Sequence, residues 1–289
     1  MKTITTLTLA GFLSMSIGSA AFFVYQDQIN VTDEDDLMAL INQEMNSNPT
    51  ASGKPAFDLL DAAQFTDTMY PWLGFPVKIL SEQQLLGTTN NELLPPDELK
   101  VKNTLLKYKN EKRIILNITS WKIGYDKNDP QTARYIQWHL NILQWAKEIL
   151  PATDIGLFGI PYSPWTALKS TQINRKNYQQ IFQNLTPIIE AADTLYPLFK
   201  IFSEEENDLA YLMGAQLYLA KSSGKPVYPI LSNKNVGDSL QAQSRISSEL
   251  TKQQCNFVRQ NADGMVWWSP EKEQWDSVWY NSVAKNCFL

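Results

Sequence analysis

Residues 113–121 read Arg113-Ile-Ile-Leu-Asn-Ile-Thr-Ser-Trp121, and this stretch decides which fold the chain can form. A short, nearly continuous apolar run of this kind is typical of a strand buried on both faces of a parallel sheet. Successive side chains on a strand point to opposite faces. We therefore expect Asn117 and Thr119, at the polar end of the run, to face the same side together, and Trp121 as well if the strand extends that far.

Similar apolar runs recur from Pro55 onward and alternate with longer segments of helical period. This alternation predicts βα units and a parallel sheet. The expected strands are Ala56–Leu60, Phe75–Leu80, Arg113–Thr119, Asp154–Ile160, Leu198–Ser203, Pro226–Leu231 and Gly264–Trp268. The expected helices run from Pro95 to Asn110, Asp129 to Pro151, Asn174 to Leu195 with a break at Pro187, Asn207 to Ser222, Ser244 to Asn261, and Gln274 to Asn286.

The 289 residues, 44% of them apolar, suit a single large domain. We predict an α/β fold, a TIM-like barrel of seven or eight βα units over residues 55–289. A doubly wound open sheet is the alternative architecture. The sequence disfavours the open sheet because no glycine-rich phosphate turn follows the first expected strand.

The amino-terminal region carries an export pattern. Lys2 precedes an apolar run that ends in small residues, so residues 1–21 are expected to be a signal peptide. An uncleaved membrane anchor is the alternative, and it would be the chain's sole link to a membrane. Residues 22–54 are polar and are expected to form a tether. We therefore expect a secreted or periplasmic protein.

The small numbers of cysteine and histidine residues limit the kinds of catalytic and metal site that the chain can form. Cys255 and Cys287 are the two cysteines, and they form either one disulfide or two buried thiols. His139 is the one histidine and no zinc-type spacing occurs, which disfavours histidine-based catalysis and metal sites. No cofactor is expected. The net charge of −5, without a dense basic run, disfavours nucleic acid as a partner.

Five segments, in this order, resemble those of hyaluronidase-like barrel glycosidases. The resemblance spans roughly residues 55–280. The segments are Arg113–Trp121, Asp154–Tyr162, Ala191–Phe199, Gly224–Pro229 and Asp263–Trp268.

The resemblance implies a sugar-binding site at the carboxyl ends of the strands. At two positions of that site this sequence differs from the family. In that family the third strand ends in an Asp-x-Glu pair, whose Glu donates a proton to the glycosidic oxygen while the Asp helps to hold the substrate's acetamido group. Asn117 and Thr119 stand at those two positions, and Lys200 replaces a family tyrosine. A threonine hydroxyl cannot supply a proton near neutral pH as a carboxylic acid with a tuned pKa does.

Three interpretations remain open. The first is a barrel that binds a glycan, expected to contain N-acetylhexosamine, but lacks the usual acid and is inactive or weakly active. The second is a working glycosidase whose acid is Glu82 or Glu204, and the third is a non-catalytic scaffold whose aromatics are core. With nine Trp and twelve Tyr in the chain, flat rings are available to stack on sugars. The expected substrate-binding residues are Trp121, Tyr162, Trp165, Lys200 and Trp268.

Overall fold

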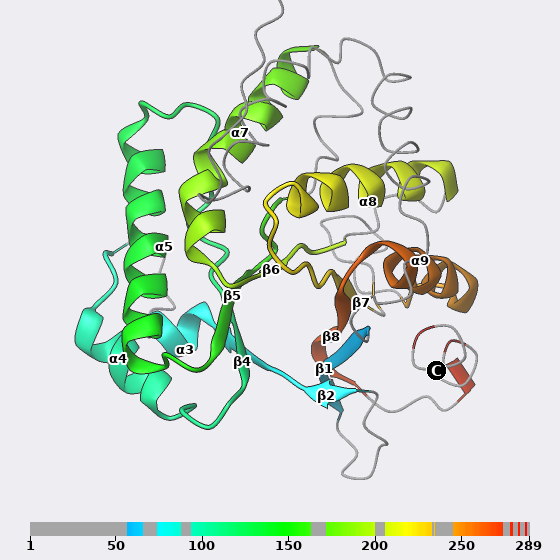
Figure 1. The fold of residues 1–289 in the computed structure, drawn as a ribbon, viewed down its shortest axis with the longest axis horizontal. Helices are drawn as coiled ribbons and strands as arrows, with labels where there is room; N and C mark the ends of the chain where they lie inside the picture. Colours follow the sequence, from blue (N-terminus) through cyan, green and yellow to red (C-terminus); the bar gives the residue numbers. More distant parts are fainter. Residues whose placement is uncertain are drawn as a thin grey trace, which may run out of the picture.

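The computed structural model describes residues 57–65, 74–87, 94–162, 172–199, 206–232, 234, 245–273, 278–279, 283 and 287. The expected signal peptide and tether lie outside these residues. Strands occupy the centre of the molecule, with α3, α4, α5 and α7 on one side and α8 and α9 on the other (Figure 1). The elements are β1 (Asp58–Phe65), β2 (Phe75–Pro76), β3 (Lys78–Ser81), α3 (Glu82–Leu86), α4 (Glu98–Leu106), β4 (Arg113–Asn117), α5 (Pro130–Ile149), β5 (Asp154–Phe158), α7 (Gln172–Ala191), β6 (Thr194–Tyr196), α8 (Glu206–Lys221), β7 (Ile230–Ser232), α9 (Ser248–Asn261) and β8 (Gly264–Glu273).

All strand pairs between these elements are parallel and form two four-stranded sheets, in the orders β2-β1-β8-β7 and β3-β4-β5-β6. Segment 75–81 links the sheets, because β2 pairs with β1 and β3 pairs with β4. At the other seam, isolated parallel bridges join Leu195 to Val227 and Leu198 to Ile230. The α/β class is as expected, but the described residues form no single closed ladder.

One expected helix was predicted to extend too far. The chain leaves α7 at Ala191, and Thr194 and Leu195, predicted as the end of that helix, belong to β6. Of the strand predicted at 198–203 the structure describes Leu198 and Phe199, and Leu198 forms an isolated parallel bridge with Ile230. Pro187 lies inside α7 without dividing it. The error arises because apolar residues of a helix face and of a short buried strand are not told apart by periodicity alone.

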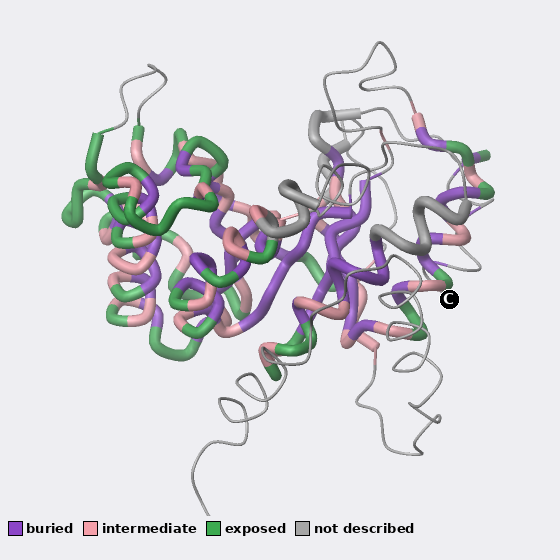
Figure 2. Tube along the Cα trace, turned by 90° about the horizontal axis from the view of Figure 1, so that it is seen from above, coloured by how far each residue is buried: buried purple, intermediate pink, exposed green. Residues whose placement is uncertain are grey.

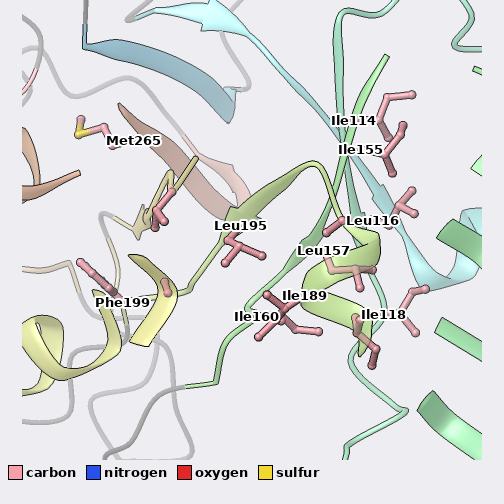
Figure 3. Packing of buried hydrophobic residues seen from close by; sticks show 14 of the residues in the cluster. Ile114, Leu116, Ile118, Ile155, Leu157, Ile160, Ile189, Leu195, Phe199 and Met265 are labelled. Atoms are coloured by element: carbon pink, nitrogen blue, oxygen red, sulfur yellow. The ribbon is translucent and has the colours of Figure 1, made fainter. Parts of the chain in front are cut away.

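Strand side chains separate into two hydrophobic clusters, as the two-residue period requires. An interior cluster collects side chains from strands of both sheets, among them Leu60, Ile115, Phe158, Ile230 and Val266. Their neighbours in sequence pack outward against the helices, and Figure 3 shows part of this outer cluster around Ile114, Leu116, Ile155 and Leu157. The buried segments run through the central strands and along the helix faces turned to them (Figure 2). Interior side chains of both sheets thus share one core although the ladder is interrupted.

Helix starts follow their sequence signals. Asp129 accepts hydrogen bonds from the backbone amides of Gln131 and Thr132 and opens α5, which has Pro130 in its first turn. Asp97 opens α4 in the same manner. The short helix α3 was not predicted, although Ser81 and Gln84 form a capping box that marks its start. Among the described residues no helix is long and apolar enough to span a bilayer.

An arginine lies at the amino end of the barrel interior. Arg113 on β4 pairs with Asp58 of β1 at 3.0 Å and with Asp154 of β5 at 3.3 Å, and it donates to the Tyr228 hydroxyl at 3.2 Å. The Tyr228 hydroxyl in turn donates to Asp58 at 3.0 Å. Burial raises the pKa of the Asp154 carboxyl, while the hydroxyl of Thr194 and the charge of Arg113 act against that shift. This Arg113 network joins strands of both sheets.

The carboxyl-terminal segment is fixed by a covalent bond. Cys255 on α9 and Cys287 form a disulfide across a sequence separation of 32 residues. Trp279, Val283 and Cys287 belong to the outer cluster, and the Trp279 indole donates to the carbonyl of Ile246 at 3.0 Å. These three residues of the carboxyl-terminal segment are therefore part of the core.

The disulfide is expected to stabilise the fold mainly by restricting the unfolded chain. For a loop of this length the double variant Cys255→Ser/Cys287→Ser should lose about 3–4 kcal/mol of unfolding free energy. Urea denaturation measures this loss, with dithiothreitol-treated wild type as the control expected to match the variant. An unchanged denaturation midpoint would contradict the expected contribution of the bond.

Removing the guanidinium should leave Asp58 and Asp154 half-buried without their cation. We expect Arg113→Met to lower the unfolding free energy by about 2–3 kcal/mol. The matched control is Lys147→Met, which breaks a more exposed ion pair with Asp193 and should cost less than about 1 kcal/mol. Equal losses of unfolding free energy in the two variants would show that the Arg113 network contributes no more to stability than the exposed ion pair does.

Candidate functional site

The polar end of β4 lies where β3 and β4 finish side by side, because Ser81 is in register with Asn117. We call the region around Ser81, Glu82, Asn117 and Thr119 the mouth. Ile115 belongs to the interior cluster, so Asn117, two residues further on, faces the same side. Its carbonyl oxygen Oδ1 is buried and has no hydrogen-bond partner within the described part of the chain. Thr119, beyond the strand, is exposed. The tip of β4 thus offers an unused acceptor and no carboxylate.

Glu82 lies beside this tip and holds it. Its carboxylate accepts hydrogen bonds from the backbone amides of Thr119 at 3.2 Å and Ser120 at 3.1 Å, and from the Ser120 hydroxyl. Three donors engage this one carboxylate. Glu82 therefore acts in this structure as an acceptor that fixes the turn after β4.

His139 lies in the core near this turn. Its ring nitrogen Nδ1 is 2.8 Å from the carbonyl oxygen of Tyr135. Burial lowers the pKa of the imidazole to about 4, while the Tyr135 carbonyl and the charge of Glu82 act in the opposite direction. At neutral pH the imidazole is uncharged, and its hydrogen bond to a helix carbonyl gives it a structural role.

Trp121 does not line a site. Its side chain is 1% exposed and packs against Trp138 at 5.1 Å and against His139 at 5.4 Å between ring centroids. The expectation that it would point into the mouth extended the strand alternation past Asn117, where β4 ends. The chain turns there, and Trp121 enters the outer core with Ile118 and Ile123.

Tyr162, after β5, is largely buried, and burial raises the pKa of its hydroxyl. That hydroxyl accepts a hydrogen bond from the backbone amide of Ile123 at 3.3 Å. Tyr162 thus also supports the chain that follows β4.

Trp268 packs against the interior cluster. It lies on β8, in register with Ala62 of β1 and Ser232 of β7, and is only partly buried. Its ring meets that of Phe158 on β5 edge to face, with centroids 5.0 Å apart. Since β5 and β8 belong to different sheets, this contact crosses the interior below the strand ends.

The structure brings Asn117, Thr119 and Glu82 together, and it moves Trp121 away. Trp165, Lys200 and Glu204 lie outside the described residues. Sequence reasoning missed Ser120, whose hydroxyl donates to Glu82, and Asn184, whose side chain donates to the carbonyl oxygens of Gly124 and Tyr125. Asn184 is distant in sequence, and no local pattern marks it. Within the described ranges, no group of three His, Cys, Asp or Glu side chains is placed to hold a metal ion.

No protein-family model matches this sequence, and no match to it is found among curated proteins. Among solved structures, bee venom hyaluronidase is similar, with a TM-score of 0.57 and 14% identity over 74% of this chain and 91% of that chain. Bee venom hyaluronidase in complex with a hyaluronic acid tetramer gives 0.57 and 13% identity over 74% and 90% of the two chains. At this identity the likeness shows the fold alone: the chain shares the α/β-barrel architecture of the bee enzyme.

Proposed function

We propose that this chain is an exported barrel that binds a glycan at the carboxyl ends of its strands and lacks the general acid that would cleave it. The observation that carries the proposal is the tip of β4, where Asn117 and Thr119 occupy the mouth and Glu82 is engaged by three donors. Loss of general acid catalysis typically removes about 10²–10⁴ in rate. Binding needs no such acid.

Two features support binding at this mouth. The partly exposed ring of Trp268 lies on the interior face of β8, where an aromatic can stack on the apolar face of a sugar. The buried carbonyl oxygen of Asn117 lacks a donor among the described residues, and a sugar hydroxyl or amide could supply one. In barrels of this class binding residues lie at this end of the strands.

The ligand of the similar bee enzyme suggests which class of oligosaccharide this chain binds. It was solved with a hyaluronic acid tetramer, and hyaluronic acid contains N-acetylhexosamine units. We propose a ligand of that class for this chain. Export is part of the proposal as well, and the disulfide supports it because disulfides persist outside the reducing cytosol.

An active hydrolase using Glu82 is the alternative, favoured by the position of Glu82 at the mouth. It requires that the wild type release reducing ends from the oligosaccharide and that Glu82→Gln stop the release. Glu204, outside the described residues, takes the same test. A non-catalytic scaffold would bind no glycan at all, and the core position of Trp121 is the one described feature that favours it.

Trp268→Ala should abolish or strongly weaken glycan binding, because the variant removes the proposed stacking surface. Isothermal titration calorimetry with the N-acetylglucosamine tetramer and the hyaluronic acid tetramer measures the loss, and a reducing-end assay on wild type should stay silent. Trp268→Phe keeps an aromatic ring beside Phe158 and serves as the control for packing. Full affinity in the alanine variant would remove this ring from the site.

Restoring the acid should create hydrolysis if the mouth is otherwise intact. Asn117→Asp with Thr119→Glu should raise the hydrolysis rate by about 10²–10⁴ over Asn117→Asp with Thr119→Gln. The nearby Glu82 carboxylate would help to keep the new carboxyl protonated, since like charges raise a pKa. Equal rates in the two double variants would mean that more than the acid is missing.

A further inference from the structure

The chain between β4 and α5, residues 118–129, forms a loop with two distinct sides. Its inner side is apolar, with Ile118, Trp121 and Ile123 at 6%, 1% and 3% exposure. Its outer side is exposed at Thr119, Ser120, Lys122 and Tyr125. The 118–129 loop therefore packs as part of the core while presenting a polar and aromatic outer face.

Side chains from several elements bind the backbone of this loop. Glu82 of α3 holds its first residues, as described above. The hydroxyl of Tyr162, after β5, accepts from the amide of Ile123 at 3.3 Å, and the hydroxyl of Thr132 on α5 accepts from the amide of Gly124 at 3.2 Å. These bonds fix the amide groups along one half of the loop.

Asn184 fixes the middle of the loop through its backbone carbonyl groups. Its side-chain nitrogen Nδ2 donates to the carbonyl oxygens of Gly124 at 2.8 Å and Tyr125 at 3.2 Å, although 59 residues separate Asn184 from Tyr125. Asn184 is itself 7% exposed and lies on α7, beside which the loop passes on its way to α5 (Figure 1). The backbone of Tyr125 is thus held at its own carbonyl group.

Fixing a loop in one conformation costs conformational entropy. Connecting loops are usually more mobile than the elements they join, and ordering one residue costs roughly 1–2 kcal/mol in backbone entropy. A binding surface that is ordered beforehand avoids this cost when its ligand arrives. The 118–129 loop has the properties of such a surface, and it begins at the mouth.

We propose that Tyr125 is a sugar-stacking residue that extends the glycan site beyond the mouth, and that Asn184 is the positioning residue for it. The inference rests on the proposed function. The Tyr125 side chain is 54% exposed, whereas most described aromatic side chains are buried or partly buried. A tyrosine ring offers a large rigid contact with little entropy to lose. The ligand is an oligosaccharide long enough to reach from Asn117 to the loop.

The experiment is calorimetric titration of wild type, Tyr125→Ala and Tyr125→Phe with the N-acetylglucosamine dimer and tetramer. Tyr125→Ala should weaken tetramer binding by roughly tenfold, the order expected for losing one aromatic contact, with less effect on the dimer. Tyr125→Phe should keep the affinity. Phe75→Ala, which removes another exposed ring at the start of β2, is the matched control and should bind as wild type does.

Asn184→Ala separates positioning from contact. It should weaken tetramer binding and speed hydrogen exchange at the amides of Ile123 and Gly124, whereas Tyr125→Ala should weaken binding without faster exchange at these two amides. Wild-type affinity in Tyr125→Ala, with binding still lost in Trp268→Ala, overturns this inference and leaves the proposed function standing. Equal losses in Tyr125→Ala and Phe75→Ala overturn it too. If wild type binds neither oligosaccharide, the proposed function and the inference fall together.

Discussion

β4 is the strand on which the rest of the structure depends, because its alternating side chains connect both ends of the barrel interior to its core. Arg113 joins Asp58 and Asp154 at the amino end, Ile115 packs in the interior cluster, and Asn117 reaches the mouth. The intervening Ile114 and Leu116 are fully buried against the helices. A shift of one residue in the register of β4 would bury the arginine among apolar side chains and turn Asn117 away from the mouth.

Side-chain contacts hold the site in place although the strands do not form one continuous ladder. The two four-stranded ladders do not merge into one, although four backbone hydrogen bonds join residues 195–199 to residues 226–230. Interior side chains add further contacts between the two sheets. Phe158 and Trp268 meet across the upper interior, and the Arg113 network does so at the lower end. Above them, the 118–129 loop is tied by side chains to α3, α5 and α7. Order at the mouth therefore comes from side chains that lie far apart in the sequence.

The sequence predicted what local physics controls. Alternating βα units, the start of α5 at Asp129-Pro130, and the strand that begins at Arg113 all follow from residue type and spacing. The failures were of two kinds. Near Leu195 a helix face and a buried strand share the same apolar composition, and at Trp121 the alternation was extended past the strand's end. The roles of Glu82 and Asn184 depend on contacts made 37 and 60 residues away, which no single stretch can reveal.

The central claim is that the tip of β4 opens onto a glycan, and the most direct measurement is nuclear magnetic resonance of the bound protein. In a titration with the N-acetylglucosamine tetramer, the side-chain amide signals of Asn117 and the indole signal of Trp268 should shift together and saturate at one ligand concentration. Saturating shifts confined to other residues, or none at millimolar tetramer, would contradict the account.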